Sequence, residues 1–225
     1  ELPEVETIRR GLSHQLQGEP VLISAQRSLL KLRFKFPSLK KLMKTSPLLA
    51  VRRRAKYLIF EFEDHLLLNH LGMTGSWRAA NDFEPSRHDH LQLGFSNGLS
   101  LIYRDPRRFG YFDLIKKNEE NTCAWLAHLG PEPLDRQIFT GDYLRTKCKG
   151  KSAPIKNFLM NQGLVVGVGN IYASEALFRA GIRPKRAAGR LTAAECASDV
   201  RRAGVPEGDG RGEGTAAPVR VPDPR

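Results

Sequence analysis

Cysteine is scarce in this chain of 225 residues, which contains only Cys123, Cys148 and Cys196. Three widely spaced cysteines exclude a paired disulfide framework, and no CxxC motif is present that could contribute to a four-cysteine zinc site. No run approaches the ~18 apolar residues of a membrane-spanning helix, and no signal peptide opens the chain. These absences predict a cytoplasmic protein without a metal site and without a membrane partner.

Acidic residues are also in deficit, because 36 lysine and arginine residues face 24 aspartate and glutamate residues. The formal charge of +12 and the pI near 9.9 predict attraction to polyanions, of which nucleic acid is the commonest. The charge alone leaves open a basic protein with no such partner. A lipid surface is disfavoured, since the chain contains no basic amphipathic helix. Hydrophobic residues make up 40% of the chain, an ordinary share for a folded globular protein.

The N-terminal half combines one helical pattern with several short alternating patterns. Apolar residues recur at helical spacing from residue 5 to residue 16, beside acidic residues that suit the positive end of a helix. Residues 57–63 alternate as a strand does, and the pair Asn97-Gly98 separates two apolar runs, which is a strong hairpin signal. Short strands at this spacing predict a β-sandwich domain over residues 1–118.

Beyond the predicted sandwich the pattern becomes helical. Two helices are predicted at residues 154–162 and 170–180, and a capping box formed by Thr192 and Glu195 opens another. We therefore expect an α+β protein whose second domain is helical and spans residues 119–202.

The last segment, residues 203–225, has a different composition. It contains five glycines, four prolines and no aromatic residue. Such a segment buries too little surface to offset the entropy of ordering. We expect it to be disordered or, alternatively, the product of a shifted reading frame.

Seven segments of the chain resemble formamidopyrimidine-DNA glycosylase in sequence, order and spacing. They are ELPEVETIRRGL (1–12), RRRAKYLIFEF (52–62), NHLGMTGSWR (69–78), RHDHLQL (87–93), DPRRFGYF (105–112), LGPEPL (129–134) and LVVGVGNIYASEALFRAGIRP (164–184). The resemblance implies an N-terminal β-sandwich with a leading helix, followed by a helix–two-turn–helix domain that binds DNA. The DPRRFG segment favours the purine-directed branch, because the sister group that acts on oxidised pyrimidines usually lacks it.

The resemblance implies an enzyme of DNA base-excision repair that is both a glycosidase and a lyase. Such an enzyme removes oxidised purines, including 8-oxoguanine and formamidopyrimidines, and cleaves abasic sites through a Schiff base. We expect a monomer whose partner is double-stranded DNA containing oxidised bases or abasic sites.

Two family features are missing from the sequence: the N-terminal proline nucleophile and the C-terminal zinc finger of four cysteines. We therefore expect no zinc finger and no bound cofactor in this chain. A catalytically inactive protein that binds damaged DNA is the alternative hypothesis. A general binder of DNA or RNA is disfavoured by the ordered family segments.

Cleavage through a Schiff base requires an amine that attacks the sugar C1′ atom. In the family the N-terminal proline supplies this amine, and Glu1 matches the carboxylate that donates or shuttles a proton beside it. Glu4 matches a residue that orients the amine. Without the resemblance, both carboxylates are explained as partners of the helix dipole. Lys56 matches the lysine that assists proton transfer in β-elimination, although a lysine at a strand end is usually only a solvated side chain.

An enzyme that acts on a base within a duplex must extrude that base and fill the gap. Met73, Arg107 and Phe109 match the side chains that the family inserts as a wedge, and Arg107 also counts as a DNA contact. Outside the resemblance, Met73 is consistent with a core position and Phe109 with a buried strand position. His88 matches a DNA contact. A metal site at residues 88–90 is disfavoured, because successive strand residues point to opposite faces.

The helical domain supplies further DNA-binding candidates. Lys151 matches a DNA contact of the family, and Lys156 and Asn170 match contacts to phosphates near the lesion. The glycines of the GVG sequence at 167–169 would let the backbone approach an anion at the start of the next helix. A solvated lysine and a tight interhelical turn are the simpler interpretations of these features. Glu175 is a candidate for the pocket of the extruded base.

Overall fold

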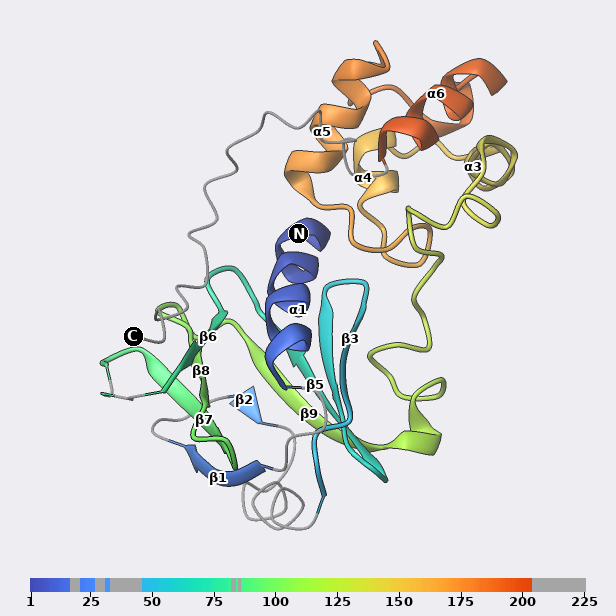
Figure 1. Cartoon of the computed structure of the whole chain (residues 1–225). Coiled ribbons are helices and arrows are strands. Elements are labelled where there is room, and N and C mark those ends of the chain that lie inside the picture. Colours follow the sequence, from blue (N-terminus) through green and yellow to red (C-terminus); the bar gives the residue numbers. More distant parts are fainter. Residues whose placement is uncertain (17–20, 27–30, 33–45, 82–83, 85, 204–225) are drawn as a thin grey trace. The chain divides into compact units, whose positions relative to one another are not determined.

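The computed structural model describes residues 1–16, 21–26, 31–32, 46–81, 84 and 86–203 (Figure 1). These residues form two compact units. Within the described residues, the first unit is Glu4–Cys123, and the second combines Glu1–Pro3 with residues 124–203. The first three residues therefore belong with the C-terminal part of the chain, although the helix that they start continues into the first unit.

Helix α1 (Leu2–Leu16) forms where the apolar spacing predicts it. Glu4 lies in its first turn, where a negative charge is stabilised by the helix dipole. Val5 and Leu12 are buried on one face of α1 and belong to the core of the first unit. The remaining face carries charged side chains, as expected for a helix that covers a core on one side only.

Nine strands lie within the described residues of the first unit and form two sheets. Their bounds are β1 (Val21–Gln26), β2 (Lys31–Leu32), β3 (Ala50–Arg54), β4 (Tyr57–Glu61), β5 (His65–His70), β6 (Ser76–Ala80), β7 (Asp89–Phe95), β8 (Ser100–Arg104) and β9 (Tyr111–Lys116). One sheet has the order β1-β7-β8-β6 and the other has the order β2-β9-β5-β4-β3. The pairing of β2 with β9 is parallel, and the other pairings are antiparallel.

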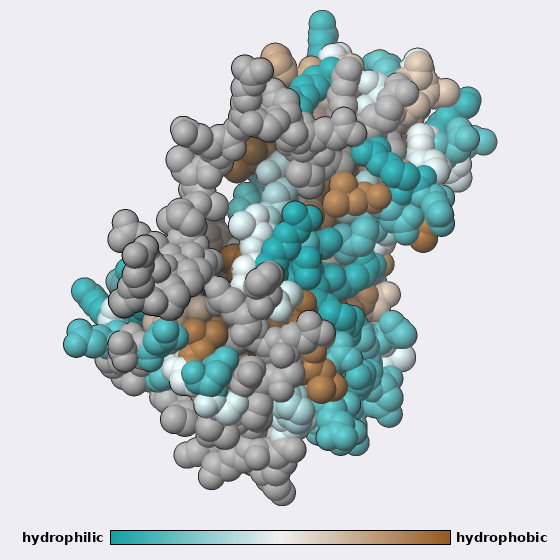
Figure 2. All heavy atoms as spheres, in the orientation of Figure 1, coloured by the Kyte–Doolittle hydropathy of each residue, from teal (hydrophilic) through white to brown (hydrophobic). Residues whose placement is uncertain are grey.

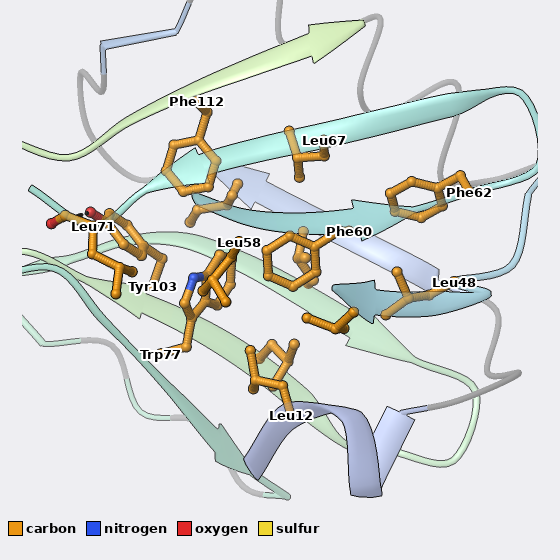
Figure 3. Packing of buried hydrophobic residues seen from close by; sticks show 14 of the residues in the cluster. Leu12, Leu48, Leu58, Phe60, Phe62, Leu67, Leu71, Trp77, Tyr103 and Phe112 are labelled. Carbon is orange, nitrogen blue, oxygen red and sulfur yellow. Dashed lines mark hydrogen bonds between the residues drawn. The ribbon is translucent and has the colours of Figure 1, made fainter. Parts of the chain in front are cut away.

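The two sheets share one core, which is drawn in Figure 3. Phe60 of one sheet and Trp77 of the other have ring centroids 5.1 Å apart, and Tyr103 and Phe112 make a second contact between the sheets at 4.9 Å. The indole of Trp77 donates a hydrogen bond of 2.8 Å to the side chain of Asn69, so this buried polar pair is satisfied. The predicted β-sandwich with a leading helix is confirmed.

The hairpin predicted at Asn97-Gly98 joins β7 to β8. Gly98 has φ +85°, which a residue with a side chain rarely adopts. The backbone amide of Phe95 donates to the carbonyl of Leu99 at 2.8 Å and closes the turn. This feature was predictable because its cause is local.

The second unit is helical in its described part. Its elements are α3 (Gly141–Cys148), α4 (Ile155–Leu159), α5 (Asn170–Arg179), the 3₁₀ helix η2 (Ala188–Arg190) and α6 (Ala193–Ala203). Another 3₁₀ helix, η1 (Lys117–Glu119), follows β9 in the first unit. Leu144, Ile155 and Leu177 lie fully buried in its separate core. Thr192 and Glu195 form the predicted capping box, because the backbone amide of each donates to the side chain of the other. Among the described helices, none combines the length and the apolar composition needed to cross a membrane.

Candidate active site

The carboxylate of Glu1 lies at the amino end of α5. It accepts hydrogen bonds from the backbone amides of Ile171 at 2.9 Å and Tyr172 at 3.1 Å. The N-cap residue of α5 is Gly169, which has no side chain that could accept these bonds. Glu1 therefore takes the place of an N-cap side chain, and the positive end of the helix dipole stabilises its negative charge.

Two glycines make room for the first residues of the chain. A Cβ atom added to Gly169 would lie 2.5 Å from the Cδ and Oε1 atoms of Glu1, closer than real side chains approach. Gly167 has φ +77°, and a Cβ added there would lie 2.4 Å from the Cδ1 atom of Leu2. The backbone amide of Leu2 donates to the carbonyl of Gly167 at 3.2 Å. Gly169 thus admits a carboxylate of the protein itself, and Gly167 admits the side chain of Leu2.

Lys56 lies in the two-residue turn between β3 and β4. The preceding Ala55 has φ +54°, a left-handed conformation that is unfavourable for a residue with a side chain. Its carbonyl accepts a hydrogen bond from Nη1 of Arg53 at 2.9 Å, and Nε of Arg53 donates to Glu6 of α1 at 3.0 Å. Helix α1 and strand β3 together hold the turn that presents Lys56.

The positive charge of Lys56 contributes to the pKa shifts of two groups in the first unit. Burial alone would raise the pKa of the Glu4 carboxyl, but hydrogen bonds and nearby positive charge, including that of Lys56, lower it. Burial, followed by the charge of Lys56, lowers the pKa of His70 to about 4, so this ring is neutral at pH 7. Glu4 and Lys56 thus share one electrostatic environment with His70, a residue that the sequence analysis did not select.

The ring of His70 is held on several sides. The amide of Gly72 donates to its Nδ1 atom at 3.0 Å, so the neutral ring carries its proton on Nε2. Tyr111 stacks on the ring with centroids 5.1 Å apart, and the hydroxyls of Tyr57 and Tyr111 lie 2.8 Å apart. A sequence signal for His70 was available in the hairpin of β4 and β5. His70 pairs there with Tyr57, and Tyr57 directly follows Lys56.

Met73, Arg107 and Phe109 lie on the two loops that follow β5 and β8. Met73 is 69% exposed and Phe109 is 45% exposed, so neither residue belongs to the core. The guanidinium of Arg107 lies 4.7 Å from the centroid of the Phe109 ring, within cation–π range. Thr74 and Asp105 connect the two loops by a hydrogen bond of 2.6 Å. The two connected loops therefore present one cationic and two apolar side chains to the surface.

His88 directly precedes β7 and is half-buried. The two residues after it make contacts inside the protein: Asp89 accepts a hydrogen bond from Arg78 at 2.9 Å, and the Nε2 atom of His90 lies 2.8 Å from the carbonyl oxygen of Asp105. Within the part of the chain that the structure describes, no three histidine, cysteine or acidic side chains lie close enough to hold a metal ion.

The remaining DNA-binding candidates lie in the second unit. Lys151 is exposed after α3, and Lys156 occupies the first turn of α4. Asn170 is the first residue of α5 and is exposed, while Glu175 on the same helix forms an ion pair with Arg179. On the face drawn in Figure 2, hydrophilic side chains cover most of the surface that is coloured by hydropathy.

Two family models match the chain. The formamidopyrimidine-DNA glycosylase N-terminal domain matches residues 1–112, and the formamidopyrimidine-DNA glycosylase H2TH domain matches residues 129–203. Together they define a class of protein that joins a β-sandwich to a helix–two-turn–helix domain.

Curated relatives and solved structures agree with these matches. Formamidopyrimidine-DNA glycosylase of Escherichia coli O6:H1 is 48% identical over 199 residues, which are 87% of this chain and 72% of that protein. The protein of the same name from Salmonella newport is 49% identical with the same coverage. The chain belongs to the formamidopyrimidine-DNA glycosylase family.

Structures of the Lactococcus lactis enzyme are similar in fold. Its complex with DNA containing an abasic site has a TM-score of 0.85 and 34% identity, covering 90% of this chain and 75% of that chain. Its complex with DNA containing an oxidised pyrimidine has the same TM-score and identity and covers 76% of that chain.

Proposed function

We propose that this protein is a base-excision repair enzyme that removes oxidised purines from double-stranded DNA and cleaves the strand at the resulting abasic site. The observation that carries the proposal is the exposure of Met73, Arg107 and Phe109 on two loops that a hydrogen bond connects. Exposed apolar side chains are unfavourable in water, and they become favourable when they stack between bases. The charge of +12 supports a polyanionic partner.

The chemistry that we assign to the site begins with an amine placed directly before Glu1, as in the family. The amine nitrogen attacks C1′ of the damaged nucleotide, the bond from C1′ to the base breaks, and the base leaves with a proton. The carboxyl group of Glu1 is the proposed proton donor or shuttle. Its hydrogen bonds to Ile171 and Tyr172 hold it at the amino end of α5.

The bond from C1′ to O4′ then breaks, O4′ takes up a proton, and the nitrogen and C1′ are left joined by the double bond of a Schiff base. The next proposed step is β-elimination from this Schiff base. A proton leaves C2′, the bond from C3′ to the phosphate oxygen breaks, and the strand is cut. Lys56 is the proposed aid to this proton transfer, and Glu4 is the proposed orienting group for the amine. Both lie in the first unit, and the positive charge of Lys56 helps to keep Glu4 ionised.

Four residues are proposed contacts to the DNA backbone: His88, Lys151, Lys156 and Asn170. Each phosphate contact by a lysine releases condensed counterions and strengthens binding at low salt. Glu175 is proposed to face the extruded base from α5, where it is partly exposed next to Arg179.

Zinc is implied by the family's four-cysteine finger, and the described cysteines do not fit it. Among the described residues, no three histidine, cysteine or acidic side chains lie close enough together to hold a metal ion. Zinc binds thiolates, usually four ligands in tetrahedral geometry. We propose that the described part of the chain binds no zinc, and no step of the reaction is assigned to the metal.

Borohydride trapping tests the proposed reaction, because the reagent reduces a Schiff base to a stable amine. The protein is prepared with a proline as its first residue, directly before Glu1, and mixed with duplex DNA containing an abasic site. We expect a covalent protein–DNA adduct, and we expect acetylation of the terminal amine to abolish it. The absence of an adduct from folded, DNA-binding protein would contradict the proposed lyase activity, and trapping that survives acetylation would identify a lysine, with Lys56 the first candidate.

A further inference from the structure

A single hydroxyl group connects the two loops that carry the exposed side chains. Oγ1 of Thr74 donates a hydrogen bond to Oδ1 of Asp105 at 2.6 Å, and the same Oγ1 accepts one from the backbone amide of Arg107 at 3.2 Å. Thr74 directly follows Met73, and Arg107 is part of the second loop. The hydroxyl of Thr74 therefore ties the position of Met73 to that of Arg107.

Asp105 is the fixed point to which Thr74 is bonded. The residue is fully buried, and its Oδ2 atom accepts hydrogen bonds from the amide of Gly110 at 2.8 Å and the hydroxyl of Tyr103 at 3.4 Å. Burial alone would raise the pKa of this carboxyl, but hydrogen bonds from Thr74 and from backbone amides of the second loop lower it. Asp105 is thus an ionised, buried acceptor whose bonds determine the shape of the second loop.

The backbone of both loops adopts conformations that need such support. Arg108 has φ +56°, a left-handed conformation that residues with side chains adopt only when the surrounding structure imposes it. Gly72 has φ +69°, and a Cβ added there would lie 2.6 Å from backbone atoms of Phe109 and Gly110. The two loops are therefore in close contact along their backbones, while the tips of Met73 and Phe109 remain exposed.

We propose that Thr74 is a positioning residue that locks these loops together, so that Met73, Arg107 and Phe109 enter the duplex as one preassembled wedge. The inference rests on the proposed function and deepens it. Insertion must offset the cost of unstacking a base step, and side chains that are already ordered lose less entropy on insertion. Thr74 then determines how strongly the enzyme prefers a weakened base pair over an intact one.

The test compares Thr74→Val, which keeps the shape of the side chain and removes the hydroxyl, with Thr74→Ser, which keeps the hydroxyl. Affinities for an abasic-site duplex and for an undamaged duplex are measured at matched salt. A hydrogen bond to a charged group is strong enough that Thr74→Val should reduce the preference for the abasic-site duplex by roughly ten-fold. Thr74→Ser should retain most of this preference.

A second measurement separates positioning from general damage to the fold. Single-stranded DNA with an abasic site has no base pair to open. When both proteins are prepared with a proline directly before Glu1, Thr74→Val should therefore be trapped on it by borohydride as well as the protein with Thr74 is. Loss of trapping on single-stranded and duplex DNA alike would overturn the inference. Thr74→Ala serves in place of Thr74→Val if the valine variant does not fold.

Phe109→Ala is the reference for the wedge itself. The inference is overturned if Phe109→Ala loses the preference for the abasic-site duplex while Thr74→Val keeps it. If Phe109→Ala also keeps the preference, the exposed side chains are not a wedge, and the proposed function fails together with the inference.

Discussion

The Oε1 atom of Glu1 accepts a hydrogen bond of 2.9 Å from the backbone amide of Ile171, although 170 positions separate the two residues. This contact places a carboxylate at the amino end of α5 where a capping side chain would otherwise stand. The N-cap position of α5 is Gly169, and a side chain there would collide with Glu1. The interaction therefore requires both the Glu1 carboxylate and the lack of a side chain at Gly169. The proposed proton donor is therefore positioned by a helix terminus.

The substitution Gly169→Ala tests this arrangement. The added Cβ atom would lie 2.5 Å from Glu1, whose flexible side chain would move away and lose its bonds to the α5 amides. Loss of an N-cap interaction costs about 1 kcal/mol of stability. In the protein prepared with a proline directly before Glu1, we expect a small decrease in the melting temperature and a much larger decrease in the rate of base excision from an 8-oxoguanine duplex.

Gly163→Ala is the matched control for this change, because a Cβ added to Gly163 would meet neighbouring atoms only at 3.3 Å and beyond. It should leave excision almost unchanged. Equal excision rates for the two alanine variants would show that the position of the Glu1 carboxylate does not matter for the reaction.

The turn that presents Lys56 is tested by Arg53→Met. The change removes the hydrogen bond to the Ala55 carbonyl and one bond to Glu6. Displacement of a reacting group by about 1 Å can cost roughly 100-fold in rate, so we expect strand cleavage at an abasic site to slow by roughly ten-fold to 100-fold at saturating DNA.

Arg10→Met is the control, since Arg10 also donates to Glu6 at 3.0 Å, from an exposed position on α1. Hydrogen bonds from Arg9 lower the pKa of Glu6 to about 2 against the effect of burial, with further contributions from Arg10 and Arg53. Glu6 therefore stays ionised in either variant. Equal cleavage rates for Arg10→Met and Arg53→Met would argue that the Ala55 carbonyl bond has no role in the reaction.

The proposed phosphate contacts are tested by the salt dependence of binding. Each lost contact should reduce the slope of log affinity against log salt concentration by roughly 0.9. We expect this reduction for Lys151→Ala and for Lys156→Ala, with a similar loss of affinity for every DNA sequence. Lys117→Ala is the control, because Lys117 forms an ion pair with Glu61 in the first unit. An unchanged slope for either test variant would remove that lysine from the DNA interface.

The carboxyl group of Asp199 on α6 predicts a dependence of stability on pH. It is fully buried, and among the described residues neither of its oxygens has a hydrogen-bond partner. Burial raises its pKa from the usual 3.8 to about 7. Between these two pH values the unfolded chain ionises at this position while the folded protein keeps the proton, so the contribution of Asp199 to the free energy of unfolding should fall as the pH rises.

Denaturant unfolding at a series of pH values measures this effect. The loss should reach a few kcal/mol near pH 7 and change little above it, because each unit of pKa shift corresponds to about 1.4 kcal/mol. His70 contributes a slope of opposite sign between about pH 4 and 6.5, because its folded pKa is lowered, so the effect of Asp199 is measured as a difference between two proteins. The stability of Asp199→Leu relative to the unsubstituted protein should increase from pH 4 to 7, whereas Asp142→Asn, a change at an exposed carboxylate of α3, should show no such increase. Identical slopes with and without Asp199 would show that this carboxyl is not buried in the folded protein.

The sequence by itself determined the features whose causes are local. The Asn97-Gly98 hairpin, the capping box of Thr192 and Glu195, and the leading helix each depend on residues within a few positions of one another. Hydrogen bonds and steric limits over such short spans act in almost any surrounding structure. The family segments added the identity of the candidate site residues, since their order and spacing are preserved along the chain.

Only the tertiary structure decided how those residues are held. The partner of Glu1 at Ile171, the support of the Lys56 turn from Glu6 through Arg53, and the link from Thr74 to Asp105 each join distant segments. No periodicity encodes such pairs, because each depends on where two separately folded elements meet. Burial is likewise a property of the packed molecule, since an apolar residue gains stability only where a neighbouring surface exists to cover it. Met73 and Phe109 are exposed because no neighbouring surface of the described protein covers them.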